Sequence, residues 1–263
     1  MLKTIVERLS RREAYKRIRL GKPIVQTRFL DCELLVRAHE EVGRNIIVGD
    51  FEFDDLRHFL GHVRDQDLVF DIGANVGAYC VPIGHRFPQA RVVSFEPIPL
   101  NAALIEVSIL VNRISNVEVV RACVTDAPGT VDFSVSEDSA YSSMIDTRRK
   151  AETSRLVCRA VSLDDYARES ALPAPDVVKI DVEGAELKVL QGAVQLFSAE
   201  GARPRFVMIE LFDKNLLAFG TSIPEIVVWM TLRGYRPYVL IEGRKAPFEL
   251  RHHNVHYNVF FER

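Results

Sequence analysis

The sequence predicts an α/β protein with a Rossmann-like, mostly parallel sheet of seven strands. Three observations support this prediction. From residue 67 onward, short apolar runs alternate with segments of helical pattern. The first of these runs leads into a glycine turn over residues 73–77, and four of the runs end in an acidic residue. Such a pattern is typical of βα units whose parallel strands lie side by side.

Length and composition limit the domain organisation and the class of partner. The chain has 263 residues, 48% of them hydrophobic, and a net charge of −2. We expect one main domain over residues 61–263 and an extension over residues 1–60. The low net charge argues against a general nucleic-acid binder. The four cysteines are far apart, which favours reduced, buried thiols. The absence of an apolar run long enough for a membrane span or a signal peptide predicts a cytoplasmic protein.

The extension begins with a basic segment. Residues 1–22 contain eight lysines and arginines, and their apolar residues fall at helical spacing. We expect a solvated helix here, and a helix in peripheral contact with an anionic membrane or a partner protein is the alternative. Short strands are predicted at residues 24–30, 33–37 and 45–48, and a helix is predicted to begin near residue 51.

The main domain continues with regular alternation. Parallel strands are predicted at residues 68–72, 91–95, 117–123, 176–181 and 206–210, and helices near residues 77–86, 100–112, 185–197 and 223–233. The last two strands, 237–241 and 256–261, are predicted to form an antiparallel hairpin. Residues 128–162 interrupt this order with an inserted hairpin of strands 130–135 and 156–161. The long polar loop 136–154 between them is typical of a lid or binding loop.

The glycine turn and the acids beside it indicate a nucleoside-containing cofactor. Gly73 and Gly77 allow a sharp turn and a close approach of the backbone to a ligand. Glu96 ends the second strand, where an acid binds the two ribose hydroxyls of such cofactors. Asp71 precedes the turn and would repel a pyrophosphate, whereas it would attract the sulfonium and ammonium groups of S-adenosylmethionine. The sequence therefore favours S-adenosylmethionine over a nicotinamide dinucleotide.

Several motifs resemble the FkbM family of S-adenosylmethionine-dependent methyltransferases. They are Asp-Ile-Gly-Ala-Asn-Val-Gly at 71–77, Phe-Glu-Pro-Ile-Pro at 95–99, Asn112, Lys-Ile-Asp-Val-Glu-Gly-Ala-Glu at 179–186 and Val-Leu-Gln-Gly-Ala at 189–193. The resemblance covers roughly residues 50–212, and the stretch from Lys179 is its most specific part. It implies the class I methyltransferase fold and O-methylation of a hydroxyl, commonly on a sugar or a polyketide-type natural product.

The predicted site residues follow the strand ends. The predicted cofactor contacts are Asp71, Gly73, Ala74, Asn75, Gly77, Glu96, Pro97, Thr125 and Asp126. Asp71 and the turn would hold the methionine end, and Thr125 and Asp126 would suit the adenine amino group. The candidate catalytic acids are Asp181, Glu183 and Glu210. Because a sugar hydroxyl is a poor nucleophile, one of these acids would act as a base, or Asp181 and Glu210 would hold Mg²⁺.

We therefore expect an O-methyltransferase that acts on a saccharide or natural-product acceptor. The alternatives are an NAD-dependent oxidoreductase and a non-catalytic module that retains the cofactor fold. The glycine spacing and Asp71 argue against the first, and the acids at four predicted strand ends argue against the second. A nucleic-acid substrate is disfavoured, because no basic stripe follows residue 22.

Overall fold

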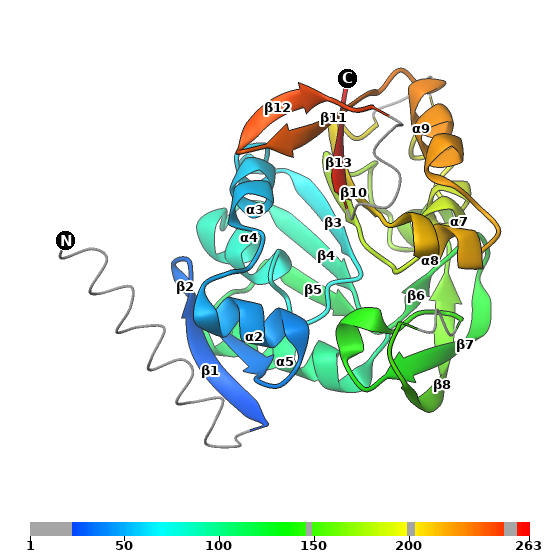
Figure 1. Cartoon of the computed structure of the whole chain (residues 1–263). Coiled ribbons are helices and arrows are strands. Elements are labelled where there is room, and N and C mark those ends of the chain that lie inside the picture. Colours follow the sequence, from blue (N-terminus) through cyan, green and yellow to red (C-terminus); the bar gives the residue numbers. More distant parts are fainter. Residues whose placement is uncertain (1–22, 146–148, 199–202, 250–256) are drawn as a thin grey trace.

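The centre of the molecule is a twisted sheet (Figure 1). The computed structural model describes residues 23–145, 149–198, 203–249 and 257–263. Within these residues the sheet has eight strands in the order β12-β11-β13-β10-β9-β3-β4-β5. The five parallel strands are β3 (Leu68–Ile72), β4 (Arg91–Phe95), β5 (Val117–Val120), β9 (Val177–Ile180) and β10 (Phe206–Leu211). The Rossmann-like architecture is thus confirmed.

The antiparallel end of the sheet is formed by β11 (Arg236–Ile241), β12 (Arg244–Pro247) and β13 (Tyr257–Glu262). Strand β13 lies between β10 and β11 and is antiparallel to both. The predicted antiparallel pairing of the last two strands is therefore confirmed. The predicted count of seven strands is one short of the eight in the described residues. The additional strand, β12, has the sequence Arg-Lys-Ala-Pro, which lacks the apolar pattern that reveals a strand.

Two layers cover the faces of the sheet. One contains β1 (Ile24–Phe29), β2 (Cys32–Arg37), α2 (Glu41–Val48), α3 (Phe53–Leu60), α4 (Cys80–Arg86) and α5 (Pro99–Val111). The other contains α6 (Leu163–Glu169), α7 (Glu186–Gln191), α8 (Asp213–Ala218) and α9 (Ile223–Thr231). Val69 packs into the first layer and its neighbour Phe70 into the second, as the alternation of a strand requires. Burial on both faces explains the continuous apolar runs of these strands.

A small three-stranded sheet interrupts the βα order. It consists of β6 (Cys123–Val124), β7 (Gly129–Ser136) and β8 (Glu152–Val161), with β8 in the middle. The antiparallel pairing of β7 with β8 confirms the predicted hairpin. The loop between them contains a short 3₁₀ helix, η1 (Ser139–Tyr141). The predicted third strand, 117–123, is divided instead, because β5 ends at Val120 and Cys123 pairs in the small sheet.

The predicted strand 45–48 is wrong, because these residues form the last turn of α2. Gly49 ends this helix in the left-handed conformation, and its N–H reaches the carbonyl groups of Asn45 and Ile46. Ile46 and Ile47 are buried in the core. Tertiary burial therefore outweighs the strand propensity of the Ile-Ile-Val run. The predicted N-terminal helix lies outside the described residues, and the domain boundary after residue 60 stays a prediction. No helix within the described part of the chain is long and apolar enough to cross a membrane.

Candidate active site

A pocket opens at the carboxyl ends of the parallel strands. The residues that line it from this edge are Gly73, Ala74 and Asn75 after β3, Glu96 and Pro97 after β4, Lys179, Asp181 and Glu183 at the end of β9, and Glu210 of β10. Because parallel strands present their carboxyl ends on one edge, the sheet collects these residues from distant parts of the sequence. The predicted acids Glu96, Asp181, Glu183 and Glu210 thus share one pocket, and their roles stay predictions.

The glycine turn brings the end of β3 against the end of β9. Gly73 has a φ of +79°, and a Cβ atom at this position would lie 1.7 Å from the carbonyl oxygen of Asp181. No residue other than glycine fits there without displacing one of the two strands. The N–H groups of Gly73 and Ala74 both donate to the carbonyl of Phe95. Gly77 is also in the left-handed region, at +86°, but it does not line the pocket.

Glu96 joins the turn to the second strand. Its carboxylate accepts hydrogen bonds from the backbone N–H groups of Asn75 at 2.8 Å and Ile98 at 2.9 Å. The side chain is 4% exposed. Burial raises the pKa of Glu96 to about 8, although the two N–H groups oppose this shift. Its position on the pocket wall agrees with the predicted contact to a ribose.

Asp71 is buried near the end of β3. Its carboxylate is 1% exposed, and Oδ2 accepts a hydrogen bond from the N–H of Cys80 at the start of α4. It is not among the residues that line the pocket. Its direct contact with a methionine group therefore stays a prediction, whereas its contact with α4 is structural.

Lys179 is a pocket residue that the site prediction omitted. Its ammonium donates to the carbonyl of Gly73 and to Asp181, each at 3.1 Å, and lies 3.5 Å from Asp71. Burial alone would favour the neutral amine, but the neighbouring carboxylates of Asp181 and Asp71 raise the pKa of Lys179. The available signal was a charged residue inside an otherwise apolar strand, because a lysine is seldom buried without a partner.

The three candidate catalytic acids lie together. Carboxylate oxygens of Asp181, Glu183 and Glu210 are within 4.8 Å of one another. Glu183 has a φ of +56° and accepts hydrogen bonds from Arg149 at 2.8 Å and from Asn215. Burial raises the pKa of Glu183, and the carboxylates of Glu210 and Asp181 raise it further. Such a group can accept a proton from a hydroxyl or coordinate a divalent cation.

The loop between β7 and β8 forms another part of the pocket wall. Its lining residues are Ser139, Ala140, Tyr141, Ser142, Met144 and Arg149. The hydroxyl of Tyr141 donates to Glu41 of α2, and the N–H of Glu41 donates to Asp138 at 2.8 Å. Arg149 lies between two aromatic rings, 4.2 Å from the ring centre of Tyr141 and 4.5 Å from that of Phe212. The loop thus bridges α2 and the candidate catalytic acid Glu183. Glu41 was not among the predicted site residues, because the helix that carries it, α2, was not predicted.

Thr125 and Asp126 are not among the residues that line this pocket, so their contact with the adenine stays a prediction. They line a separate surface hollow. The Thr125 hydroxyl donates to Asp126 at 2.7 Å, and Asp126 forms an ion pair with Lys188 at 3.2 Å. The chain leaves the main sheet after Val120, and Thr125 and Asp126 follow the pocket-lining residues Cys123 and Val124. The wall beyond Glu96 consists instead of apolar side chains, namely Ile98, Cys123, Val124 and Phe133.

Comparison with known proteins identifies the family. The family model described as the methyltransferase FkbM domain matches residues 71–237. The chain is 26% identical over 216 residues to the hexuronic acid methyltransferase AglP of Haloferax volcanii, covering 79% of this chain and 83% of AglP. It is 27% identical over 212 residues to the 31-O-demethyl-FK506 methyltransferase FkbM of Streptomyces tacrolimicus, covering 67% of this chain and 78% of that enzyme.

Two further matches bear on length and fold. The AMB antimetabolite synthetase AmbE of Pseudomonas aeruginosa is 28% identical over 226 residues, and the match covers 69% of this chain but 10% of AmbE. The crystal structure of M. jannaschii TYW2 in complex with AdoMet superposes with a TM-score of 0.51 at 14% identity, covering 92% of this chain and 87% of TYW2. At this identity the superposition shows the fold alone.

Proposed function

Because the chain belongs to the FkbM family and is a methyltransferase, we propose that it transfers a methyl group from S-adenosylmethionine to a hydroxyl of a saccharide or natural-product acceptor. The observation that carries this proposal is the pocket, in which Glu96 accepts a hydrogen bond from Asn75 of the glycine turn and three more carboxylates lie beside the loop between β7 and β8. When bound, S-adenosylmethionine supplies an activated methyl group on a sulfonium.

The residues of the pocket fit this cofactor. Carboxylates are the groups that favour its sulfonium and ammonium charges. The apolar wall of Ile98, Val124 and Phe133 suits an adenine ring beside the ribose site at Glu96. The Oδ1 atom of Asn75 is buried, and no group among the described residues donates to it. A buried acceptor without a donor is costly, so a ligand that donates a hydrogen bond is favoured there.

The acceptor class rests on the relatives. AglP is named for methylation of a hexuronic acid, and FkbM is named for methylation of a demethylated oxygen of FK506. Both names describe transfer to a small molecule or saccharide. A hydroxyl acceptor also agrees with the acidic group of Asp181, Glu183 and Glu210, because transfer to an alcohol requires removal of its proton.

Among the three acids, we assign the proton-accepting role to Asp181. Its side chain is 32% exposed, against 12% for Glu183, so a substrate can reach it. An ion pair of 3.1 Å with Lys179 fixes the orientation of the Asp181 carboxylate. The Glu183 carboxylate, in contrast, already accepts hydrogen bonds from Arg149 and Asn215. Orientation of the hydroxyl contributes much of the rate in such a displacement. A Mg²⁺ ion held by Asp181 and Glu210 is the alternative way to acidify the hydroxyl.

Calorimetric titration tests the cofactor assignment directly. We expect S-adenosylhomocysteine to bind the purified protein and NAD to show no binding, because the carboxylates of the pocket repel a pyrophosphate. Radiolabelled S-adenosylmethionine should then label glucuronosides or macrolide alcohols. Binding of NAD without a response to S-adenosylhomocysteine would support the oxidoreductase instead. Binding of S-adenosylhomocysteine without labelling of any hydroxyl acceptor would support a cofactor-binding module.

A further inference from the structure

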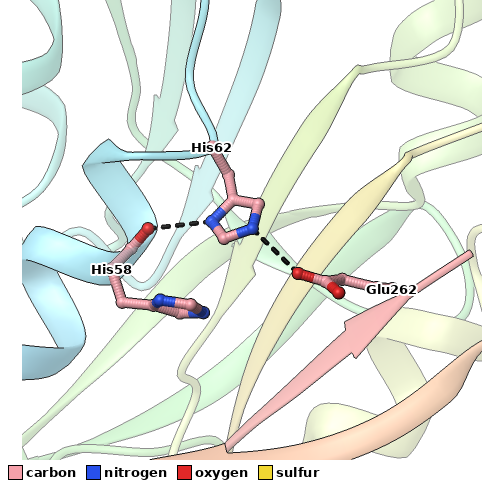
Figure 2. A group of neighbouring side chains, drawn as sticks. All are labelled: His58, His62 and Glu262. Carbon is pink, nitrogen blue, oxygen red and sulfur yellow. Dashed lines mark hydrogen bonds and ion pairs between the residues drawn. The ribbon is translucent and has the colours of Figure 1, made fainter. Parts of the chain in front are cut away.

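A second group of metal-ligating side chains lies at the other end of the sheet. His58 belongs to α3, His62 follows the end of that helix, and Glu262 is the last residue of β13 (Figure 2). Glu262 pairs with Phe206, the first residue of β10, whereas Glu210 of the pocket lies near the opposite end of β10. The group is therefore remote from the proposed methyl-transfer site and independent of it.

His62 contacts Glu262 through the ring nitrogen that is not bonded to the backbone. Nδ1 of His62 lies 2.8 Å from the carbonyl oxygen of His58, so Nδ1 carries a hydrogen and donates it. In a neutral imidazole the other nitrogen, Nε2, is then an acceptor. This Nε2 lies 2.8 Å from Oε1 of Glu262, which is also an acceptor when ionised. With a neutral His62 two acceptors would face each other, so the contact requires a cation between them, which is either a second proton on the imidazole or a metal ion.

We propose that His58, His62 and Glu262 form a binding site for a divalent transition-metal ion of the Zn²⁺ type. One ligand atom from each residue lies within 4.8 Å of the other two. The two histidines are four residues apart at the end of α3, so they project from the same side of the chain (Figure 2). Two imidazoles and one carboxylate are a ligand set that Zn²⁺ accepts, and the hydrogen bond from His62 to the carbonyl of His58 holds the ring in the orientation that a metal ligand needs.

The side chains of Tyr238 and Lys245 contact the proposed ligand residues. Tyr238 donates from its hydroxyl to Oε1 of Glu262 at 2.7 Å, and the same hydroxyl lies 2.7 Å from Nε2 of His58. The ammonium of Lys245 lies 2.6 Å from the same Oε1 atom. The Lys245 side chain is 50% exposed and extends from the hairpin strand β12. It can therefore withdraw into solvent, and it competes with the metal for Glu262.

The site would connect two distant parts of the chain. A metal between His62 and Glu262 would tie the end of α3 to the last strand of the sheet, where Glu262 already contacts Tyr238. Because an ion that binds the folded chain and not the unfolded chain stabilises the fold, the expected role is structural.

Zn²⁺ titrated into the full, untagged chain by calorimetry tests this proposal. We expect binding at one site, weakened at least about tenfold in His58→Gln and in His62→Gln. His85→Gln, which removes an exposed histidine of α4, is the matched control and should bind Zn²⁺ like the parent. Lys245→Met should bind Zn²⁺ more tightly than the parent, because it removes the competing cation.

Equal Zn²⁺ affinity in the parent and in both histidine variants would overturn the proposal, as would a lack of binding by the parent. An unchanged or weaker affinity for Zn²⁺ in Lys245→Met would also contradict it, because Lys245 would then not compete with a metal ion for Glu262. If His62→Gln does not fold, His58→Gln and Lys245→Met answer the question. The ligand-field absorption of bound Co²⁺ provides a second readout, which His58→Gln should lose. Neither result depends on the methyltransferase assay.

Discussion

The ammonium of Lys179 lies 3.5 Å from Oδ1 of Asp71, and the two side chains are 5% and 1% exposed. This buried pair joins neighbouring strands of the sheet, because Asp71 is in β3 and Lys179 is its register partner in β9. Asp71 also accepts a hydrogen bond from Cys80 at the start of α4. The acid of the glycine motif therefore holds the turn in place, and Lys179 compensates its charge.

Replacing Lys179 with Met should destabilise the fold strongly. The change leaves the Asp71 carboxylate buried without its cation, and breaking a buried pair in this way costs about 3–5 kcal/mol. The double variant Asp71→Asn/Lys179→Met should recover part of this loss. The free energy of unfolding in urea measures both effects. Arg91→Met is the control, because it breaks an exposed pair with Glu118 that contributes less than about 1 kcal/mol. Equal losses of unfolding free energy in Lys179→Met and Arg91→Met would contradict this interpretation.

Gly73→Ala should damage both the fold and the pocket. The new methyl group would lie 1.7 Å from the carbonyl oxygen of Asp181, so the ends of β3 and β9 would have to separate. We expect a loss of stability of about 3 kcal/mol or more, well above the cost of a positive φ alone. Gly220→Ala is matched, with a φ of +71° and nothing within 4 Å of the added atom, and should cost about 1 kcal/mol. Similar losses of unfolding free energy in the two variants would refute a steric role for Gly73.

Glu96→Ala should weaken the binding of S-adenosylhomocysteine by about 1.5–3 kcal/mol, the value of charge-assisted hydrogen bonds. This corresponds to about a 10- to 150-fold increase in the dissociation constant. Calorimetry measures the change, and circular dichroism shows whether the fold is retained. A dissociation constant equal to that of the parent would remove Glu96 from the site.

The affinity for S-adenosylhomocysteine should also depend on pH through Glu96. The raised pKa of about 8 means that the free protein holds a proton on this carboxyl at neutral pH. If the ionised form binds the ribose hydroxyls, ligand binding must release that proton. Affinity should then increase as the pH rises toward 8 and become constant above it. Glu96→Gln cannot ionise, so its affinity should be flat over this range. A parallel pH dependence in Glu96→Gln would assign the effect to another group.

Arg149→Met tests the loop wall of the pocket. Arg149 connects Tyr141 of the loop to Glu183 through a cation–π contact and an ion pair of 2.8 Å. Its loss should loosen the loop and lower turnover of the acceptor about tenfold or more, while the affinity for S-adenosylhomocysteine stays within a few-fold. Arg155→Met, in the exposed part of β8, serves as the control. If Arg149→Met changes only the cofactor affinity, the loop does not close over the acceptor.

Asp181→Asn should lower turnover by about 10²-fold or more, the contribution of a general base. The substitution keeps the shape of the side chain and removes its charge, so cofactor affinity should change little. Assays with a chelator separate the two roles of Asp181. Loss of activity on chelation, restored by Mg²⁺, indicates a metal, and indifference indicates a direct base. Turnover at the parent rate would transfer the role to Glu183 or Glu210.

Local sequence patterns determined most of the sheet and its acidic edge. Strands such as β3 and β10 are continuous apolar runs, because both of their faces are buried. The carboxyl ends of parallel strands lie on one edge of the sheet, independently of the helices that connect them. The proximity of Glu96, Asp181 and Glu210 therefore followed from the strand assignments. The family motifs lie at the same strand ends, which is why the family was also predicted from the sequence.

Tertiary contacts decided the remaining features, because no local pattern records them. The segment 45–48 is helical since the core buries Ile46 and Ile47, although its residues favour a strand. Cys123 and Val124 line the pocket because the chain crosses into the small sheet after β5, and Thr125 lies just beyond them. Lys179 lines the pocket because Asp71 and Asp181, which are far from each other in sequence, both lie beside its ammonium. Their negative charges offset the cost of burying the lysine. His62 meets Glu262 only when the last strand is placed beside β10, 200 residues along the chain.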